Sequence, residues 1–270
     1  MFAKLFQKIK RWWYNRAHAA VAPTPEPQRP VPPRPTIPDT TPEPQRPEPP
    51  APTIPDATPE PQVPVIGNND LWYPKAVQGS GMKMQGRYRK GYPEGAIVHF
   101  TAGRCNTEQE AKDSLAWGIN EGYTFFVIGP TGVVYQNFPL SHWGHHAGNS
   151  SWPGLGSGVS NYLVGIEVAC AGRVDSTGKS WFNVTYPPER LRTVPAKDNR
   201  QAGTYVKYTP EQEKALVDLL VWLKKNNPKV FRTDLILGHD SVSPGRKNDP
   251  GGSLSMTIPE LQKLIAELTQ

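Results

Sequence analysis

Hydrophobic residues in the second part of the chain gather in short runs that have the length and composition of β-strands. Five such runs, rich in Val, Ile, Leu and Phe, occupy residues 95–101, 124–128, 133–137, 162–169 and 234–238. The second and third runs are separated by the turn sequence Gly129-Pro130-Thr131-Gly132, so they are predicted to form a hairpin.

Polar start signals followed by apolar stripes predict helices between these strands. Thr107 and Glu110 form a capping box at the first start, and Thr209 and Thr257 mark two more. The stripe after the second start consists of Ala215, Leu216, Leu219, Leu220 and Leu223. The pattern predicts a single α/β domain over residues 67–270, with a central mixed β-sheet flanked by helices. Roughly 200 residues are enough to bury a sizeable core.

Two segments of this domain show no periodicity. Residues 139–160 are rich in glycine and histidine, and we expect them to form a substrate-facing loop. Residues 171–208 are long and polar, and we expect an insertion near the rim of a cleft.

Composition sets a different segment apart before this domain. More than half of the chain's 31 prolines lie between Pro23 and Pro64, in a stretch without aromatic residues or glycine. The phrase Thr-Pro-Glu-Pro-Gln begins at Thr24, Thr41 and Thr58, a repeat of 17 residues. Because such a stretch cannot bury a core, residues 21–66 are predicted to be a disordered, extended, Pro-rich linker. A Pro-x-x-Pro motif that binds a partner is the alternative.

Residues 1–20 combine apolar positions at helical spacing with uncompensated positive charge. The apolar set is Phe2, Leu5, Phe6, Ile9, Trp12 and Trp13, and the basic set is Lys4, Lys8, Lys10, Arg11 and Arg16. This pattern is typical of an N-terminal amphipathic helix at an anionic interface and predicts contact with a bacterial membrane or lipopolysaccharide. Docking on a partner protein or on the following domain is the alternative. Nucleic acid is not expected as a partner, because the basic cluster is short.

The N-terminal segment does not resemble a signal peptide, since charges interrupt its apolar residues every few positions. No run approaches the ~18 apolar residues of a membrane-spanning helix. The protein is therefore expected to be made in the cytoplasm without a signal peptide. The two cysteines, Cys105 and Cys170, are too few for a disulfide framework and are expected to be free thiols.

Candidate chemistry is concentrated in the loop that follows the last strand-like run. His239, Lys247 and Asp249 lie close together there, and His99 lies in the run 95–101. Two imidazoles and one carboxylate make a three-ligand zinc site with an open fourth position, the pattern of a catalytic zinc. Taken singly, a strand-end histidine is more often a hydrogen-bonded core residue, and Asp-Pro-Gly is usually a turn.

Five short motifs occur in an order that resembles a known family. They are Val98-His99-Phe100-Thr101-Ala102-Gly103, Gly122-Tyr123-Thr124-Phe125, Trp143-Gly144-His145-His146-Ala147-Gly148, Val164-Gly165-Ile166-Glu167, and Gly238-His239-Asp240 followed by Pro244 to Gly251. With them, residues 70–270 resemble zinc-dependent N-acetylmuramoyl-L-alanine amidases of type 2, a superfamily that includes phage lysozymes of the amidase kind and peptidoglycan recognition proteins. The resemblance implies a zinc hydrolase that cuts the amide between N-acetylmuramic acid and L-alanine of the stem peptide.

The resemblance also implies roles for single residues. It makes His99, His239 and Asp249 the Zn²⁺ ligands. It makes Lys247 the group that polarises the scissile carbonyl or steadies the oxyanion, Glu167 the general base, and Tyr123 a further catalytic residue. Substrate-binding residues are Thr101 and one of two adjacent histidines, His145 or His146. For Glu167 the alternative is a strand carboxylate paired with a surface lysine, and for Tyr123 it is a core aromatic residue.

The domain and its N-terminal segments together predict a monomeric peptidoglycan hydrolase, a phage-type endolysin that acts on the bacterial cell wall. The alternatives are a cytosolic muropeptide-recycling amidase, a non-catalytic peptidoglycan-binding module, and a virion-associated lysin or secreted toxin. A recycling enzyme has no use for a cationic helix on a long tether. The presence of both Lys247 and Asp249 favours catalysis over binding alone.

Overall fold

The computed structural model describes residues 71–79, 84–123 and 126–270. These residues belong to one compact unit, Val63–Gln270. The predicted amphipathic helix at residues 1–20 and nearly all of the linker predicted at 21–66 fall in the other unit, and both lie outside the described residues.

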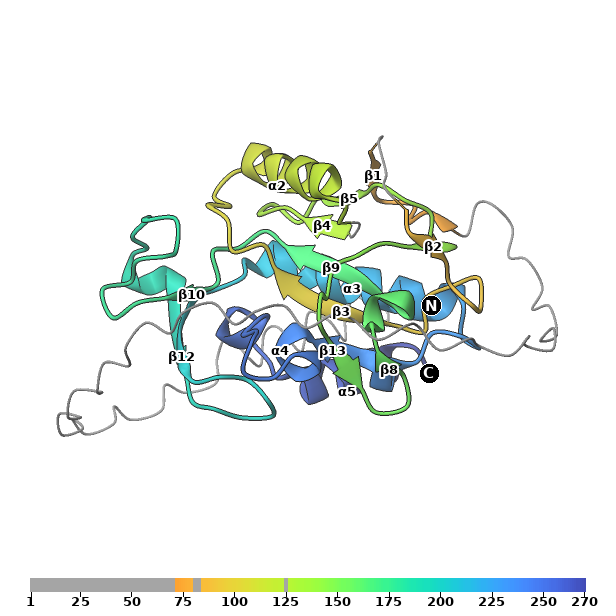
Figure 1. The fold of residues 1–270 in the computed structure, drawn as a ribbon. Coiled ribbons are helices and arrows are strands. Elements are labelled where there is room, and N and C mark those ends of the chain that lie inside the picture. Colours follow the sequence, from red (N-terminus) through yellow and green to blue (C-terminus); the bar gives the residue numbers. More distant parts are fainter. Residues whose placement is uncertain (1–70, 80–83, 124–125) are drawn as a thin grey trace, which may run out of the picture. The chain divides into compact units, whose positions relative to one another are not determined.

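A six-stranded mixed sheet forms the centre of the domain (Figure 1). Its order is β1 (Val77–Gln78), β5 (Val134–Gln136), β4 (Phe126–Ile128), β9 (Leu163–Val168), β3 (Gly95–Phe100) and β13 (Ile236–Gly238). Only β4 and β5 pair antiparallel, through the turn predicted at residues 129–132, and the other neighbours are parallel. The predicted fold class is confirmed. The last strand is shorter than expected because Thr233–Leu235 forms a 3₁₀ turn, η4.

Three helices begin at the predicted positions. They are α2 (Glu108–Glu121), α3 (Pro210–Asn226) and α5 (Ile258–Leu268). The first two start with complete capping boxes at Thr107 and Thr209, and at the third Glu260 accepts from the backbone N–H of Thr257 at 2.8 Å. In Figure 1, α2 lies above β4 and α3 runs behind the sheet. The predicted stripe of α3 faces the core, since Leu216, Leu219 and Leu220 are fully buried. None of the described helices has the length and apolar character needed to cross a membrane.

The register of the sheet sets the direction of the residues that matter for function. Four residues lie opposite one another in a row across neighbouring strands. In order they are His99 of β3, Glu167 of β9, Val127 of β4 and Tyr135 of β5. Residues directly opposite one another in a sheet point to the same face. Ala111 and Leu115 of α2 pack in one cluster with Val127 and Tyr135. His99 and Glu167 therefore leave the sheet side by side, on the face that α2 covers.

The two segments without sequence periodicity are both structured. Residues 139–160 contain β6 (His142–Trp143), which pairs with β2 (Gly86–Arg87), and β7 (Ser151–Trp152), which pairs with β8 (Gly156–Ser157), before the 3₁₀ turn η2 (Val159–Asn161). Residues 171–208 contain η3 (Pro188–Arg190) and a three-stranded sheet of β10 (Arg173–Val174), β12 (Gly203–Val206) and β11 (Leu191–Val194). The insertion predicted at residues 171–208 does reach a cavity, through Trp181 and Phe182, but its strands were not predicted. Strands of two to four residues are too short to show an alternation in sequence.

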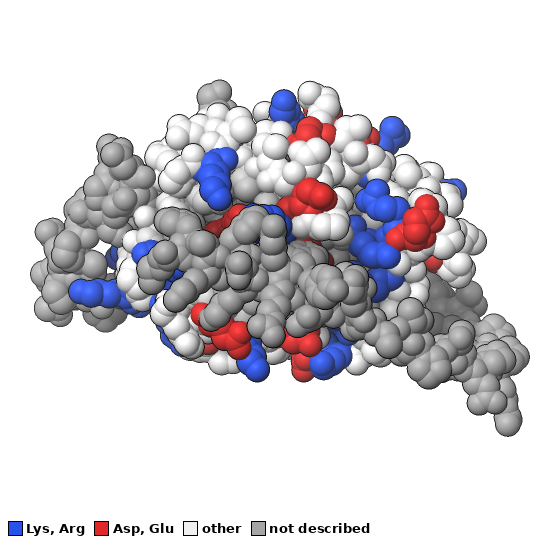
Figure 2. All heavy atoms as spheres, turned by 180° about the vertical axis from the view of Figure 1, so that it is seen from behind, with Lys and Arg blue, Asp and Glu red and all other residues white. Residues whose placement is uncertain are grey.

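Two further features complete the description. Cys105 and Cys170 are buried free thiols, as predicted. Figure 2 shows Lys and Arg side chains interspersed with Asp and Glu over the described surface of the rear face. Oppositely charged side chains also form ion pairs, such as Lys214–Asp218 and Lys90–Glu94, at 2.7 and 2.8 Å.

Candidate metal centre

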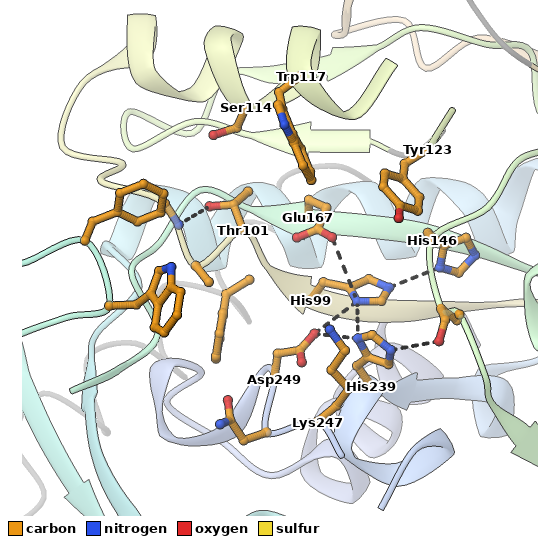
Figure 3. A pocket seen from close by; sticks show the side chains of 18 of the residues that line it. His99, Thr101, Ser114, Trp117, Tyr123, His146, Glu167, His239, Lys247 and Asp249 are labelled. Carbon is orange, nitrogen blue, oxygen red and sulfur yellow. Dashed lines mark hydrogen bonds and ion pairs between the residues drawn. The ribbon is translucent and has the colours of Figure 1, made fainter. Parts of the chain in front are cut away.

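His99, His239 and Asp249 converge on one point at the carboxyl ends of the parallel strands. The Nδ1 atoms of the two histidines lie 2.9 Å apart, and Asp249 Oδ2 lies 3.0 Å from His99 Nδ1 and 2.9 Å from His239 Nδ1. All three side chains are buried. His99 lies in β3 as predicted, whereas His239 follows β13 as the first residue of a short helix, α4 (His239–Val242). The predicted ligand set is thus assembled in one place (Figure 3).

The donor set and its spacing fit a tetrahedral zinc ion. Ligand atoms at about 2.0–2.2 Å from zinc lie roughly 3.3 Å from each other in a tetrahedron, close to the distances observed. Two imidazoles and one carboxylate leave one corner for water or substrate, as in catalytic zinc sites.

The outer nitrogen of each histidine is held by an acceptor, which fixes the proton on the side away from the metal position. His239 Nε2 lies 3.0 Å from the carbonyl oxygen of Ala147, so it must donate. His146 Nε2 lies 2.8 Å from the carbonyl oxygen of Leu163 and also donates, which leaves His146 Nδ1 to accept from His99 Nε2 at 3.1 Å. Both Nδ1 atoms in the cluster therefore keep a lone pair for a metal ion.

The electrostatics of the cluster favour the protonation states that a metal ion needs. Burial, together with the charge of His239, lowers the pKa of His99 to about 4, which keeps its imidazole neutral at physiological pH. Burial alone would raise the pKa of Asp249. The hydrogen bonds to His239 and His99 outweigh burial and hold that pKa below its usual range, so the carboxylate is ionised.

Glu167 stands next to the cluster with one oxygen unused. Its Oε1 lies 3.9 Å from His99 Nδ1, and its Oε2 is buried and has no hydrogen-bond partner among the described residues. Burial, followed by the charge of Asp249, raises the pKa of Glu167 to about 8, while Lys247 acts in the opposite direction. A buried carboxylate without a partner is costly, so this position is more readily explained by chemistry than by folding.

A cavity of about 880 Å³ opens over this cluster. Glu167, Lys247, Tyr123, Thr101 and His146 line it together with the three candidate ligands. Figure 3 shows Glu167 and Tyr123 on the α2 side of the cluster and Lys247 beside Asp249 and His239. Tyr123 is partly exposed and follows the left-handed C-cap Gly122 of α2, at φ 88°, so the alternative of a core aromatic residue does not describe it.

The two adjacent histidines occupy different environments. His146 is buried behind His99 and uses both ring nitrogens, as described above. It fits there because residue 165 is glycine: a Cβ at that position would lie 2.7 Å from His146 Cγ. His145 is exposed, stacks edge-on with Trp143 at a centroid distance of 5.5 Å, and is not among the residues that line the cavity. His146 thus orients the ring of His99, and contact of His145 or His146 with substrate stays a prediction.

Replacing His146 with alanine is expected to weaken zinc binding by about 10- to 100-fold, because His99 loses the acceptor that fixes its tautomer. Competition with a fluorescent zinc chelator measures this affinity. His146→Gln, which offers both a donor and an acceptor, should retain more affinity, and His145→Ala is the matched control. Unchanged zinc affinity in His146→Ala would contradict the positioning role.

Thr101 lines the cavity, but its hydroxyl group is occupied by its own surroundings. Its Oγ1 lies 2.9 Å from Cys105 Sγ and accepts from the backbone N–H of Cys170 at 3.3 Å. These contacts tie the end of β3 to the end of β9. Contact between Thr101 and substrate stays a prediction.

Several residues at the cavity carried no assignment from sequence. Arg246 donates to the carbonyl oxygens of Ala147 and Asn149, both at 2.8 Å, and thereby fixes the loop that accepts from His239. Three exposed aromatic residues also line the cavity, Trp117, Trp181 and Phe182. Arg246 lies within the last of the five sequence motifs, between Pro244 and Gly251, so the sequence did contain a signal that it belongs to the site. The aromatic residues lie in a helix and in an insertion, where sequence gave no indication.

The fold and the cluster together define a mixed α/β protein with a candidate metal site of the hydrolase type at its strand ends. The profile of the N-acetylmuramoyl-L-alanine amidase family (Amidase_2) matches residues 89–252, which include all three candidate ligands. The chain belongs to this family. The comparison with curated protein sequences gave no significant match.

Similar folds are found among solved structures. An AmpD derivative is 19% identical, with a TM-score of 0.49, and the match covers 72% of this chain and 97% of that one. Escherichia coli AmiD, solved with anhydro-N-acetylmuramic acid-L-Ala-D-γ-Glu-L-Lys, is 19% identical, with a TM-score of 0.45 and coverages of 67% and 61%. Pseudomonas aeruginosa AmpDh3, solved with anhydromuramic pentapeptide, is 18% identical, with a TM-score of 0.45 and coverages of 64% and 59%. This chain thus spans less than two thirds of AmiD and of AmpDh3.

Proposed function

We propose that this protein is a zinc-dependent peptidoglycan hydrolase that cuts the amide between N-acetylmuramic acid and L-alanine of the stem peptide. The observation that carries the proposal is the convergence of His99, His239 and Asp249 beneath an open cavity, beside an oxygen of Glu167 that has no hydrogen-bond partner in the described part of the chain. A complete ligand set and a free carboxylate favour catalysis over a module that only binds the wall.

The chain's own residues supply the proton transfer and part of the charge stabilisation. When bound, zinc would lower the pKa of a coordinated water towards neutrality and polarise the scissile carbonyl. Glu167, next to His99, would in its ionised form accept a proton from the attacking water and return it to the leaving amine; since its pKa is raised to about 8, this role is favoured as the pH rises towards that value. Lys247 lines the same cavity and is placed to stabilise negative charge that develops on the carbonyl oxygen.

Removal of the Lys247 charge tests whether this residue stabilises the negative charge on the carbonyl oxygen. Lys247→Ala is expected to keep zinc and to lower kcat by about 10²- to 10³-fold, as when one donor to an oxyanion is lost. Steady-state kinetics on a soluble muropeptide, with zinc content measured in parallel, checks both expectations. Lys247→Arg should recover part of the rate, and full turnover in the alanine variant would remove Lys247 from the mechanism.

Mass spectrometry of digested peptidoglycan tests the proposed reaction. The expected products are free stem peptides that begin with L-alanine, together with glycan chains of unchanged length, and a chelator should abolish their release. Shortened glycan or cuts within the stem peptide would contradict the assignment of the bond.

We further propose that the enzyme acts as a lytic, phage-type endolysin, made in the cytoplasm and active at the cell wall. The support is the cationic, apolar pattern of residues 1–20 and the Pro-rich segment that joins it to the amidase domain. A recycling amidase that acts on small muropeptides in the cytosol needs neither segment.

Deletion of residues 1–20 distinguishes a lytic endolysin from a recycling amidase. The shortened protein should digest purified wall at the full rate but should kill intact cells with an outer membrane far less well, because it lacks the membrane-active segment. Parallel turbidity assays on purified wall and on whole cells measure the difference. Equal killing by both proteins would refute the membrane role of residues 1–20.

A further inference from the structure

A hairpin from the insertion between β9 and α3 carries two large aromatic side chains at its tip. The backbone N–H of Ser180 donates to Val184 O at 2.8 Å, and that of Asn183 donates to Ser180 O at 2.9 Å. Asn183 has φ 58°, in the left-handed region. This is a three-residue hairpin loop that closes on a left-handed residue, and Trp181 and Phe182 occupy its first two positions.

The hairpin is fixed to the wall of the active-site cavity. Tyr186 at its base is buried, and its hydroxyl group donates to Arg104 O at 2.7 Å. In the turn that leads into the hairpin, Asp175 Oδ1 accepts from the backbone N–H groups of Thr177 and Lys179 at 2.8 and 3.0 Å. The tip is therefore held in place from both sides, and Trp181 and Phe182 line the same cavity as His99 and Asp249.

The aromatic tip contributes little to the core of the domain. Trp181 is 84% exposed and Phe182 is 46% exposed. Turn positions usually carry small or polar residues, and clustered exposed aromatic side chains commonly mark a binding surface. We therefore expect Trp181 and Phe182 to contact a bound ligand.

We infer that Trp181, assisted by Phe182, forms a carbohydrate subsite that stacks on a pyranose ring of the peptidoglycan glycan strand. The inference rests on the proposed function. Of the two parts that flank the scissile amide, the stem peptide carries mostly carboxylates, amines and small methyl groups. Only the sugar offers a broad face of C–H groups that can pack flat against an indole ring. The subsite adapts the enzyme to polymeric wall, in which sugars continue beyond the muramic acid residue.

A membrane is a less suitable occupant for these two side chains. They form part of the cavity wall together with the candidate metal ligands, so a bilayer that covered them would compete with substrate for the same surface. A sugar ring on Trp181 instead extends the bound substrate out of the cavity along the glycan.

Calorimetric titration of the full-length protein with peptide-free glycan tests the subsite. The probe is a set of oligosaccharides of alternating N-acetylglucosamine and N-acetylmuramic acid without stem peptides, so binding needs no catalysis. Trp181→Ala is expected to weaken binding by about tenfold, and Trp181→Phe by less, because part of the stacking surface remains. Val77→Ala, at an exposed position that does not line the cavity, is the matched control and should bind as the wild type does.

Three results would overturn the subsite: no glycan binding by the wild-type protein, equal binding by Trp181→Ala, or loss of affinity only for anionic vesicles in that variant. The thermal midpoint of Trp181→Ala should match the wild type, because the side chain is exposed. Glycan binding that depends on Trp181, without release of stem peptides, would support the subsite and contradict the amidase reaction. The experiments can therefore contradict the glycan subsite and the amidase reaction independently of each other.

Discussion

Replacement of Asp249 with alanine should abolish wall hydrolysis and zinc retention together. Asp249 is the only carboxylate in the three-residue cluster, and its Oδ2 lies within 3.0 Å of both histidine Nδ1 atoms. Without it, two neutral imidazoles remain to bind a divalent cation, and the site loses the negative charge that offsets the charge of the ion. Because free water has a pKa of about 15.7, against about 7 when bound to zinc, we expect at least about a 10³-fold loss of rate.

Zinc content by mass spectrometry and hydrolysis of purified wall measure the two effects on the same sample. Asp249→Asn keeps the shape of the side chain but not its charge, and it should also lose zinc. Asp198→Ala, at an exposed aspartate that does not line the cavity, is the control and should retain both properties. One zinc per chain in Asp249→Ala would count decisively against the ligand assignment.

Glu167→Gln should retain zinc and lose about 10²- to 10⁴-fold in kcat, the range that general acid–base catalysis supplies. Glutamine has nearly the shape of glutamate but accepts no proton, so the change removes the chemistry and keeps the packing. The buried Oε2 of Glu167 has no partner among the described residues, so the substitution breaks no described hydrogen bond there. The variant should therefore be at least as stable to heat as the wild type.

Kinetics with a soluble muropeptide measure the expected loss of kcat, and a thermal unfolding scan measures the stability of the variant. A stable, zinc-loaded Glu167→Gln protein that turns over at the wild-type rate would show that another group moves the proton. Glu189→Gln, at an exposed position in η3, is the control.

Two of the three candidate ligands, His99 and His239, could be located from sequence because each follows a simple rule. His99 lies in an apolar run and His239 directly follows another, and the parallel strands that these runs form carry their carboxyl ends to one edge of the sheet. The helix starts at Thr107, Thr209 and Thr257 could be identified for the same reason, since a cap is a local interaction over four residues.

The role of His146 could not be derived in this way. Sequence offered His145 and His146 as equal candidates for contact with substrate, and nothing local distinguishes them. The distinction comes from the sheet: Gly165 leaves space on β9, and Leu163 presents a carbonyl oxygen that orients the ring of His146 towards His99. Such a relation depends on packing between segments far apart in the chain.

The aromatic tip at Trp181 was missed for a related reason. Sequence places this residue and its neighbour Phe182 in a polar segment without periodicity, where neither has a predicted partner. Only the folded hairpin, with Tyr186 bonded to the loop after β3, brings it to the cavity. Residues 1–66 contributed function hypotheses from composition alone, and these stay predictions.

Zinc K-edge X-ray absorption on the full-length protein tests the metal centre most directly. The expected result is one zinc per chain with only nitrogen and oxygen ligands at about 2.0–2.2 Å, including two imidazoles, and a spectrum that changes in Asp249→Ala. A sulfur shell near about 2.3 Å would place Cys105 or Cys170 on the metal instead. Either that result or a protein that binds no zinc would contradict a site built from His99, His239 and Asp249.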